Sequence, residues 1–205
     1  MPERPLPEKV LERLRKPATV RALERHLGML ENADHRAMAL ANTRRIPTEI
    51  WGGRVRSLRL KNPPVTVIVK REHANANARD TIDYIAKTID KLNTHNSYAH
   101  LFTLRKPHAY PLSRKLIAMA KTDKPNVTEI LGTEPYATER GRQFIAELER
   151  KHGVTKKQVR TAFEHLRQQS RHANMMNNWL LLGVEGTGRL GHGKRLVFMQ
   201  LADIW

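Results

Sequence analysis

The sequence predicts an α/β protein, with helices and strands mixed along the chain, and three observations support this prediction. Apolar residues recur at helical spacing up to about Arg45, which is typical of a helical arm. A short β-branched run, Val65–Val69, is typical of a buried strand. The last fifty residues combine a capped basic helix with two apolar runs around a glycine-rich basic loop, Gly186–Arg195. These changes in pattern predict three parts: residues 1–62, 63–135 and 136–205.

The composition predicts a polyanionic partner. The 205-residue chain has 37 Lys and Arg against 20 Asp and Glu, which gives a formal net charge of +17. So large an excess costs self-repulsion, which binding to nucleic acid would relieve. The basic excess occurs in all three parts, with 14 basic against 7 acidic residues, then 11 against 7, then 12 against 6. We therefore expect a long contact with DNA or RNA.

Several classes of protein are excluded by what the sequence lacks. The chain has no cysteine, which rules out disulfides, cysteine-based zinc sites and thiol catalysis. No apolar run approaches the roughly 18–20 residues that a membrane span needs. The segment Met1–Pro7 lacks the apolar core of a secretion signal. We therefore expect an intracellular, cytoplasmic protein with no membrane partner.

Residues 1–62 are predicted to form a helical arm and a basic linker. Helices are expected from about Pro7 to Leu14 and from about Thr19 onward, separated by a break at Pro17. The second helix is expected to end at Ile46-Pro47, because a residue before proline disfavours the helical conformation. The basic strand or linker that follows supplies candidate nucleic-acid contacts: Arg54, Arg56 and Arg59.

Residues 63–135 are predicted to form a small β-α-β-α module. We expect strands at 65–69 and 98–104, each followed by a helix, after Asn77 and at 111–121, and a further strand at 127–131. This order resembles Alba-type and other small RNA-binding α/β domains. If the first two strands are parallel, the basic residues after them meet at the sheet edge where such folds bind ligands. Those candidate contacts are Lys70, Arg71, Arg105 and Lys106.

Residues 136–205 contain two capped helices joined by a short turn. Thr138 is expected to cap the first helix, and Gly153 to end it. Thr155 and Gln158 have the spacing of a capping box at the start of the second helix. The apolar stripe of that helix faces inward, which leaves candidate contacts to phosphates and bases outside: Lys156, Lys157, Arg160, Arg167 and Gln168.

The order of helix, tight turn, capped helix and apolar–glycine–apolar hairpin resembles the winged helix-turn-helix family over residues 136–205. The resemblance implies that the second helix lies in a major groove and that the hairpin contacts the backbone or the minor groove. One departure from the family pattern is the segment from Ser170 to Asn178, which is longer and more polar than the usual link to the wing.

The glycine-rich loop adds basic candidates and a second resemblance. Glycines let backbone N–H groups approach phosphates, and the charged members of the loop are Arg189, His192, Lys194 and Arg195. A Walker loop would need Ser or Thr at position 195, and the chain ends too soon for a dinucleotide-binding unit. Similar loops occur near the C-terminus of the RNA-processing endonucleases of CRISPR systems. Those proteins have ferredoxin-like folds with an early strand, whereas this chain opens with about forty helical residues.

The leading functional prediction is non-catalytic nucleic-acid binding, by a DNA-binding regulatory factor or by a subunit of a nucleoprotein complex. No HExxH motif and no compact metal-ligand spacing occurs, so we expect no metal and no cofactor. One alternative is a nuclease or a CRISPR-type endonuclease, with His192 as the candidate catalytic residue. Another is a protein-interaction subunit that docks on other proteins through the helical stripe Leu23, Leu27 and Leu30.

Overall fold

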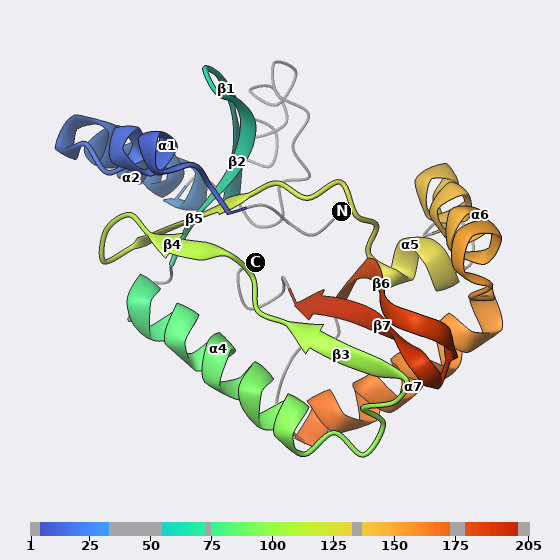
Figure 1. Cartoon of the computed structure of the whole chain (residues 1–205). Helices are drawn as coiled ribbons and strands as arrows, with labels where there is room; N and C mark the ends of the chain where they lie inside the picture. Colours follow the sequence, from blue (N-terminus) through green and yellow to red (C-terminus); the bar gives the residue numbers. More distant parts are fainter. Residues whose placement is uncertain (1–4, 33–54, 73–74, 133–136, 173–178, 201–205) are drawn as a thin grey trace. The chain divides into compact units, whose positions relative to one another are not determined.

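The computed structural model describes residues 5–32, 55–72, 75–132, 137–172 and 179–200, and it confirms the mixed α/β class (Figure 1). Among these residues there are six helices and two sheets. The helices are α1 (Glu8–Leu14), α2 (Pro17–Asn32), α4 (Ala78–Thr94), α5 (Val127–Leu131), α6 (Glu139–His152) and α7 (Lys156–His172). The strands are β1 (Val55–Lys61), β2 (Pro64–Arg71), β3 (Phe102–Arg105), β4 (Ala109–Pro111), β5 (Leu116–Ala120), β6 (Trp179–Leu190) and β7 (His192–Gln200).

The chain forms two compact units, each assembled from separate stretches of sequence. The N-terminal unit is drawn from the ranges Glu3–Tyr84 and His108–Thr122. The C-terminal unit is drawn from Ile85–Pro107 and Asp123–Asp203. The predicted middle part, residues 63–135, therefore contributes to both units, and the unit boundaries do not coincide with residues 62 and 135.

The N-terminal unit is a four-stranded antiparallel sheet with two helices. The strand order is β1-β2-β5-β4, and α1 and α2 share a buried apolar cluster with β2 and β5. Pro17 separates the helices as predicted and occupies the first position of α2, where its missing N–H is tolerated. Leu23 and Leu27 lie in the buried cluster. The prediction that they form an exposed docking stripe is therefore wrong, because this unit already covers them.

Two predictions of secondary structure in the middle part are wrong. Residues 111–121 form β5 and the end of β4, not a helix; four consecutive residues of β5, Leu116–Met119, are buried. A short apolar run of this kind lacks the periodicity that separates a strand from a helix. Residues 127–131 form α5, not a strand. Asn126 and Glu129 build a capping box there, which satisfies N–H groups at the start of the helix.

The predicted parallel pairing of the first two middle strands is also wrong. The predicted strand at 65–69 lies in β2, which belongs to the four-stranded sheet. The predicted strand at 98–104 begins only at Phe102 as β3, which belongs to a separate three-stranded sheet. The basic residues after these two strands therefore do not share a sheet edge.

The C-terminal unit combines the sheet β3-β7-β6 with helices α5, α6 and α7 (Figure 1). Strands β6 and β7 form an antiparallel hairpin, and β3 pairs in parallel with β7, with Phe102 opposite Leu196. The inward stripe of α7, which includes Val159, Ala162 and Leu166, is fully buried. Apolar burial of this stripe fixes which side of α7 remains exposed.

The predicted caps of α6 and α7 are confirmed. The Oγ1 atom of Thr138 accepts a hydrogen bond from the N–H of Gly141, and Gly153 ends α6 in the left-handed conformation with φ 64°. The N–H of Thr155 donates to Oε1 of Gln158 at 2.9 Å, and the N–H of Gln158 donates to Oγ1 of Thr155 at 3.3 Å. This reciprocal pair is the predicted capping box.

Gly141 is expected to tolerate no side chain, although it lies in the first turn of a helix. A Cβ atom there would lie 2.1 Å from the carbonyl oxygen of Glu129 in α5. Gly141→Ala should therefore lower the free energy of unfolding by about 1–3 kcal/mol, as overpacked substitutions do. Urea denaturation measures the change. At the exposed position Ala146 in α6 the order should reverse, with Ala146→Gly costing about 1 kcal/mol. Stabilisation by Gly141→Ala would contradict the close packing of α5 on α6.

Candidate nucleic-acid interface

The exposed side of α7 carries a line of basic side chains. Lys156, Arg160, Arg167 and Arg171 are all exposed. They stand at positions i, i+4, i+11 and i+15, so at 3.6 residues per turn they fall within a narrow strip of the helix surface. With a rise of about 1.5 Å per residue, the strip is about 22 Å long. We call these four residues the basic strip.

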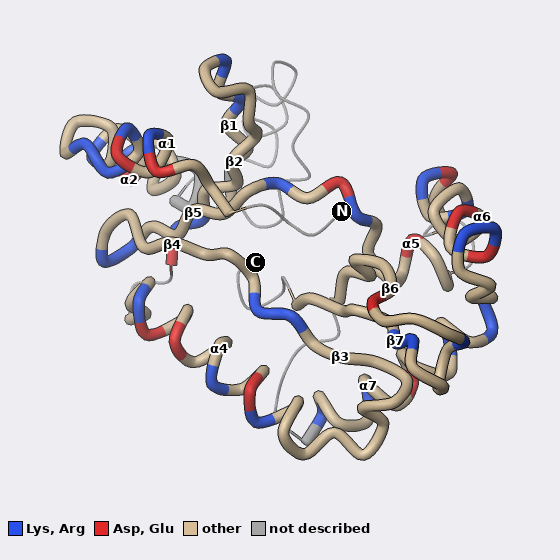
Figure 2. Tube along the Cα trace, viewed as in Figure 1, with Lys and Arg blue, Asp and Glu red and all other residues tan. Residues whose placement is uncertain are grey.

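The basic strip is little neutralised by neighbouring acids. Glu164 is the only acidic residue of α7. Among the residues that the structure describes, no carboxylate lies within ion-pair distance of the four cations of the strip. Lys157 and Gln168 are exposed beside the strip. Elsewhere acidic and basic positions alternate, as Figure 2 shows along α4 and α6. The strip therefore has a charge that remains available to a polyanion.

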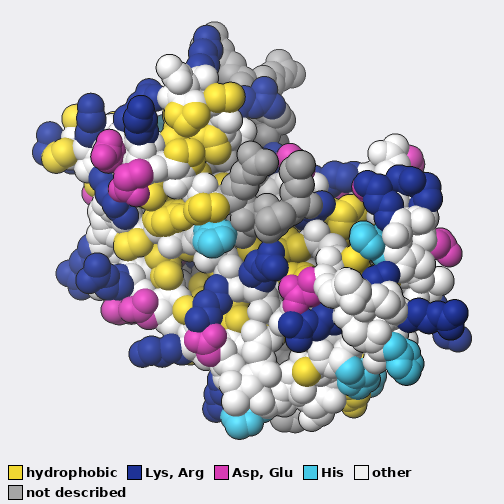
Figure 3. Space-filling view, viewed as in Figure 1, with side chains coloured by type: hydrophobic (Ala, Val, Ile, Leu, Met, Phe, Trp, Pro, Cys, Tyr) yellow, Lys and Arg dark blue, Asp and Glu magenta, His cyan; other side chains and the backbone are white. Residues whose placement is uncertain are grey.

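The start of α7 is joined to the β6–β7 hairpin. The Nζ atom of Lys194 in β7 donates a hydrogen bond to the carbonyl oxygen of His152, the last residue of α6, at 3.0 Å. The hairpin thus lies against the turn that precedes Lys156. Arg189 and His192 are exposed near the hairpin end. Figure 3 shows histidine side chains gathered over this part of the C-terminal unit, with basic side chains beside them.

The pKa of His152 reflects the positive surroundings of this turn. Partial burial and the nearby charges of Lys194 and Lys151 lower the pKa of His152 below the ordinary histidine value, although Glu147 opposes the shift. His152 is therefore expected to be neutral at neutral pH. A positive potential at this turn would also favour a bound anion.

Lys194→Gln is expected to raise the pKa of His152. The substitution removes a positive charge that disfavours the imidazolium form, so protonation of His152 becomes easier. An NMR titration of the His152 ring signals measures the change. Arg142→Gln, on the exposed surface of α6, serves as the control and should leave the His152 titration unchanged. A lower or unaltered pKa in Lys194→Gln would show that Lys194 does not set the potential at this turn.

The glycines of the hairpin have a role that the sequence did not reveal. Gly186, Gly188 and Gly193 all have positive φ angles. A Cβ atom at any of them would lie within 2.0–2.6 Å of a carbonyl oxygen on the opposite strand. These glycines therefore permit the irregular pairing of β6 with β7, independently of any approach to phosphate.

Three predicted contacts of the C-terminal unit are held in ion pairs. The Nε atom of Arg195 lies 2.7 Å from Oε1 of Glu185, and Nη2 of Arg105 lies 3.5 Å from Oε2 of the same carboxylate. The Nζ atom of Lys106 lies 2.6 Å from Oδ2 of Asp90. These cations are partly neutralised, so they contribute less to an anion-binding surface than the basic strip does.

The predicted contacts of the N-terminal unit are dispersed. Lys70 is buried, and its Nζ atom lies 3.2 Å from Oε1 of the buried Glu72, so Lys70 is an internal charge and not a surface contact. Arg71 is half-buried, and its guanidinium group lies beside Gly28 of α2. Arg59 is exposed on β1. Arg54 and the side chain of Arg56 lie outside the described residues.

The sequence analysis missed Arg171 and the turn at Lys151 and His152. Arg171 was missed because α7 was expected to end near Gln169, yet it continues to His172. The four-residue spacing from Arg167 would have revealed it. The proximity of His152 to Lys194 depends on tertiary contact, so no local signal could have found it.

The described residues contain no group of three or more His, Asp or Glu side chains that could hold a metal ion. Among them, no helix combines the length and the apolar character that crossing a membrane requires. His192 is exposed, and no described side chain lies within hydrogen-bond distance of its ring. Comparisons with protein-family models, with curated proteins and with solved structures found no match.

Proposed function

We propose that the protein is a non-catalytic nucleic-acid-binding protein of the cell interior, either a DNA-binding regulatory factor or a subunit of a nucleoprotein complex. The observation that supports the proposal best is the basic strip of α7. Its four cations span about 22 Å, and a duplex presents one phosphate charge per roughly 1.7 Å of its axis. A partner with closely repeated negative charge can neutralise the whole strip at once.

The order of elements around the strip favours duplex DNA. Helix α6, a short turn, α7 and the β6–β7 hairpin follow the order of a winged helix-turn-helix protein. In that family the second helix occupies a major groove, and α7 has the corresponding position here. The exposed Lys157 and Gln168 beside the strip are side chains that can also hydrogen-bond base edges.

Salt dependence of binding tests the proposal. Fluorescence anisotropy of the full chain with labelled duplex DNA, duplex RNA and single strands should show tight binding at 50 mM salt for at least one of them. With four phosphate contacts, the logarithm of the affinity should fall against the logarithm of salt concentration with a slope of about −3 to −4. Affinity that does not change up to a few hundred millimolar salt would refute the proposal.

A nuclease is the second candidate function, and one observation favours it. The ring of His100 lies beside Gly191, the residue that precedes His192, so two histidines occur at the hairpin end. Incubation of the protein with labelled RNA and DNA tests this function. Cleavage that is lost in His192→Ala, with binding retained, would favour the enzyme. Binding without cleavage by the unaltered protein would favour the proposed function.

A further inference from the structure

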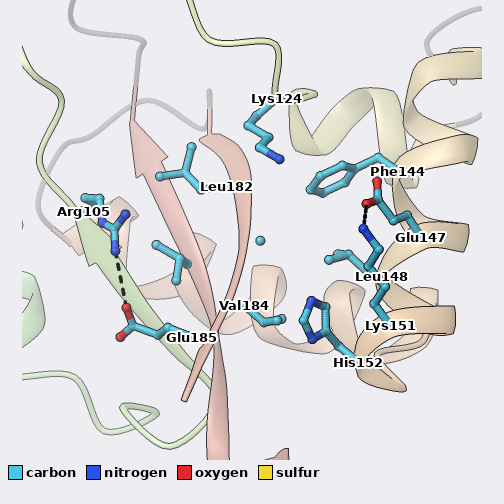
Figure 4. Close-up of a pocket in the computed structure, with 12 residues that line it drawn as sticks. Arg105, Lys124, Phe144, Glu147, Leu148, Lys151, His152, Leu182, Val184 and Glu185 are labelled. Atoms are coloured by element: carbon cyan, nitrogen blue, oxygen red, sulfur yellow. Dashed lines mark hydrogen bonds and ion pairs between the residues drawn. The ribbon is translucent and has the colours of Figure 1, made fainter. Parts of the chain in front are cut away.

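A pocket of about 340 Å³ lies within the C-terminal unit, between α6 and β6 (Figure 4). This volume is at the small end of the range for ligand pockets, so a ligand of modest size would fill it. Phe144 and Leu148 project into the pocket from α6, and Leu182 and Val184 face them from β6. The pocket thus has two apolar walls, which suit a flat ring.

A bulge in β6 keeps one side of the pocket open. The pairing of β6 with β7 shifts between Leu181 and Gly183, and Gly183 has a φ of 141°. A Cβ atom added at Gly183 would have no heavy atom within 4 Å. The bulge therefore leaves open space beside the backbone of the strand, where a ligand could approach closely.

Cations from three elements surround the apolar walls. Arg105 comes from β3, Lys124 from the segment before α5, and Lys151 from the last turn of α6. The Nζ atom of Lys124 lies 4.9 Å from the centre of the Phe144 ring. The 3.5 Å separation of Arg105 from Glu185 is at the limit of a hydrogen bond, so its guanidinium keeps donors for a further anion.

The two acidic residues of the pocket are already engaged. The Nζ atom of Lys151 lies 2.5 Å from Oε1 of Glu147, and the Nε atom of Arg195 lies 2.7 Å from Oε1 of Glu185. With Arg195 and Lys194 close by, the cations outnumber the carboxylates around the pocket. An anionic group is therefore favoured over a cationic one.

We propose that this pocket binds a nucleotide, with its base against the Phe144 side of the apolar walls and its phosphate beside Arg105 and Lys124. The aromatic ring favours a flat partner, and guanidinium and ammonium groups are the usual partners of phosphate. The nucleotide could be a free mononucleotide or the phosphorylated end of a single strand. In the second case the inference rests on the proposed function.

Titration of the full chain with adenosine monophosphate tests the inference, by calorimetry and by NMR. We expect saturable binding, about tenfold weaker for adenosine, for inorganic phosphate and for glycerol phosphate. Arg105→Gln and Lys124→Gln should each weaken nucleotide binding several-fold. Val184→Phe should weaken it about tenfold by filling the pocket. Arg142→Gln, which is exposed on α6 and does not line the pocket, is the matched control and should bind normally.

The two sources of the nucleotide are separated by competition. A hexanucleotide with a terminal phosphate that displaces the mononucleotide more effectively than its unphosphorylated form would identify a strand end. Displacement by free nucleotides alone would identify a mononucleotide site. Either result supports the pocket. No saturation by about 10 mM nucleotide, equal binding of inorganic phosphate, or unaltered binding in all three pocket variants would overturn it.

The inference and the proposed function can fail separately. Val184→Phe should retain duplex binding, because Val184 is uncharged and lies outside the basic strip. Nucleotide binding by a chain that shows no salt-dependent duplex binding would leave the pocket standing and refute the proposed function. Salt-dependent duplex binding without any nucleotide binding would do the reverse. Circular dichroism of each variant confirms that the comparison is made between folded proteins.

Discussion

Replacing Arg160 and Arg167 together by glutamine is expected to weaken duplex binding by about tenfold to a hundredfold at low salt. Both side chains are exposed on α7 and have no acidic partner among the described residues. Each lost phosphate contact also removes counterion release, so the slope against salt should become shallower by about 2. Anisotropy titrations at several salt concentrations measure both effects.

Glu164 offers a control on the same exposed face of the helix. Glu164→Gln removes the only acidic charge of α7, so it should strengthen duplex binding where the arginine substitutions weaken it. Arg142→Gln removes a charge that pairs with Glu139 on α6, and it should have little effect. Equal weakening by Arg142→Gln and by the α7 pair would show that net charge alone drives binding. The basic strip would then have no special role.

Phe198→Ala should destabilise the C-terminal unit by about 3–5 kcal/mol. Phe198 is fully buried in β7, with its ring centre 5.9 Å from that of Phe102 in β3 and 6.4 Å from that of Phe163 in α7. Truncation removes contacts to a strand and to the helix that carries the basic strip. Urea denaturation followed by fluorescence can measure the loss, because the buried Trp179 belongs to the same unit.

Phe198→Leu provides the matched comparison for this substitution. Leucine keeps most of the apolar volume, so it should cost less than half as much as alanine. Phe198→Ala should also weaken duplex binding at temperatures where the unit begins to unfold, since α7 would lose its support. A loss below about 1 kcal/mol in Phe198→Ala would contradict the central position of this ring.

The helices of the candidate interface were predictable because their signals are local. Capping depends on residues three positions apart, so Thr155 and Gln158 could be recognised without a fold. The inward stripe of α7 likewise determined that Arg160 and Arg167 face outward. The same logic, applied to Asn126 and Glu129, would have predicted α5 correctly in place of a strand.

The strand errors have a different physical cause. Leu116–Met119 is apolar without interruption, and such a run has no period to read. The fate of Lys70 likewise depended on tertiary burial. Its neighbour Glu72 lies two residues on in the chain, where the charges could equally have remained in solvent.

The sequence alone determined the charge of this protein, the start and end of α6 and α7, and the exposed side of α7, because these depend on composition and on neighbours within a few residues. Only the tertiary structure decided which cations remain available. It placed Arg195, Arg105 and Lys106 in ion pairs, and it joined Lys194 to His152. Such contacts join residues that are distant in sequence, and they form only when strands and helices pack.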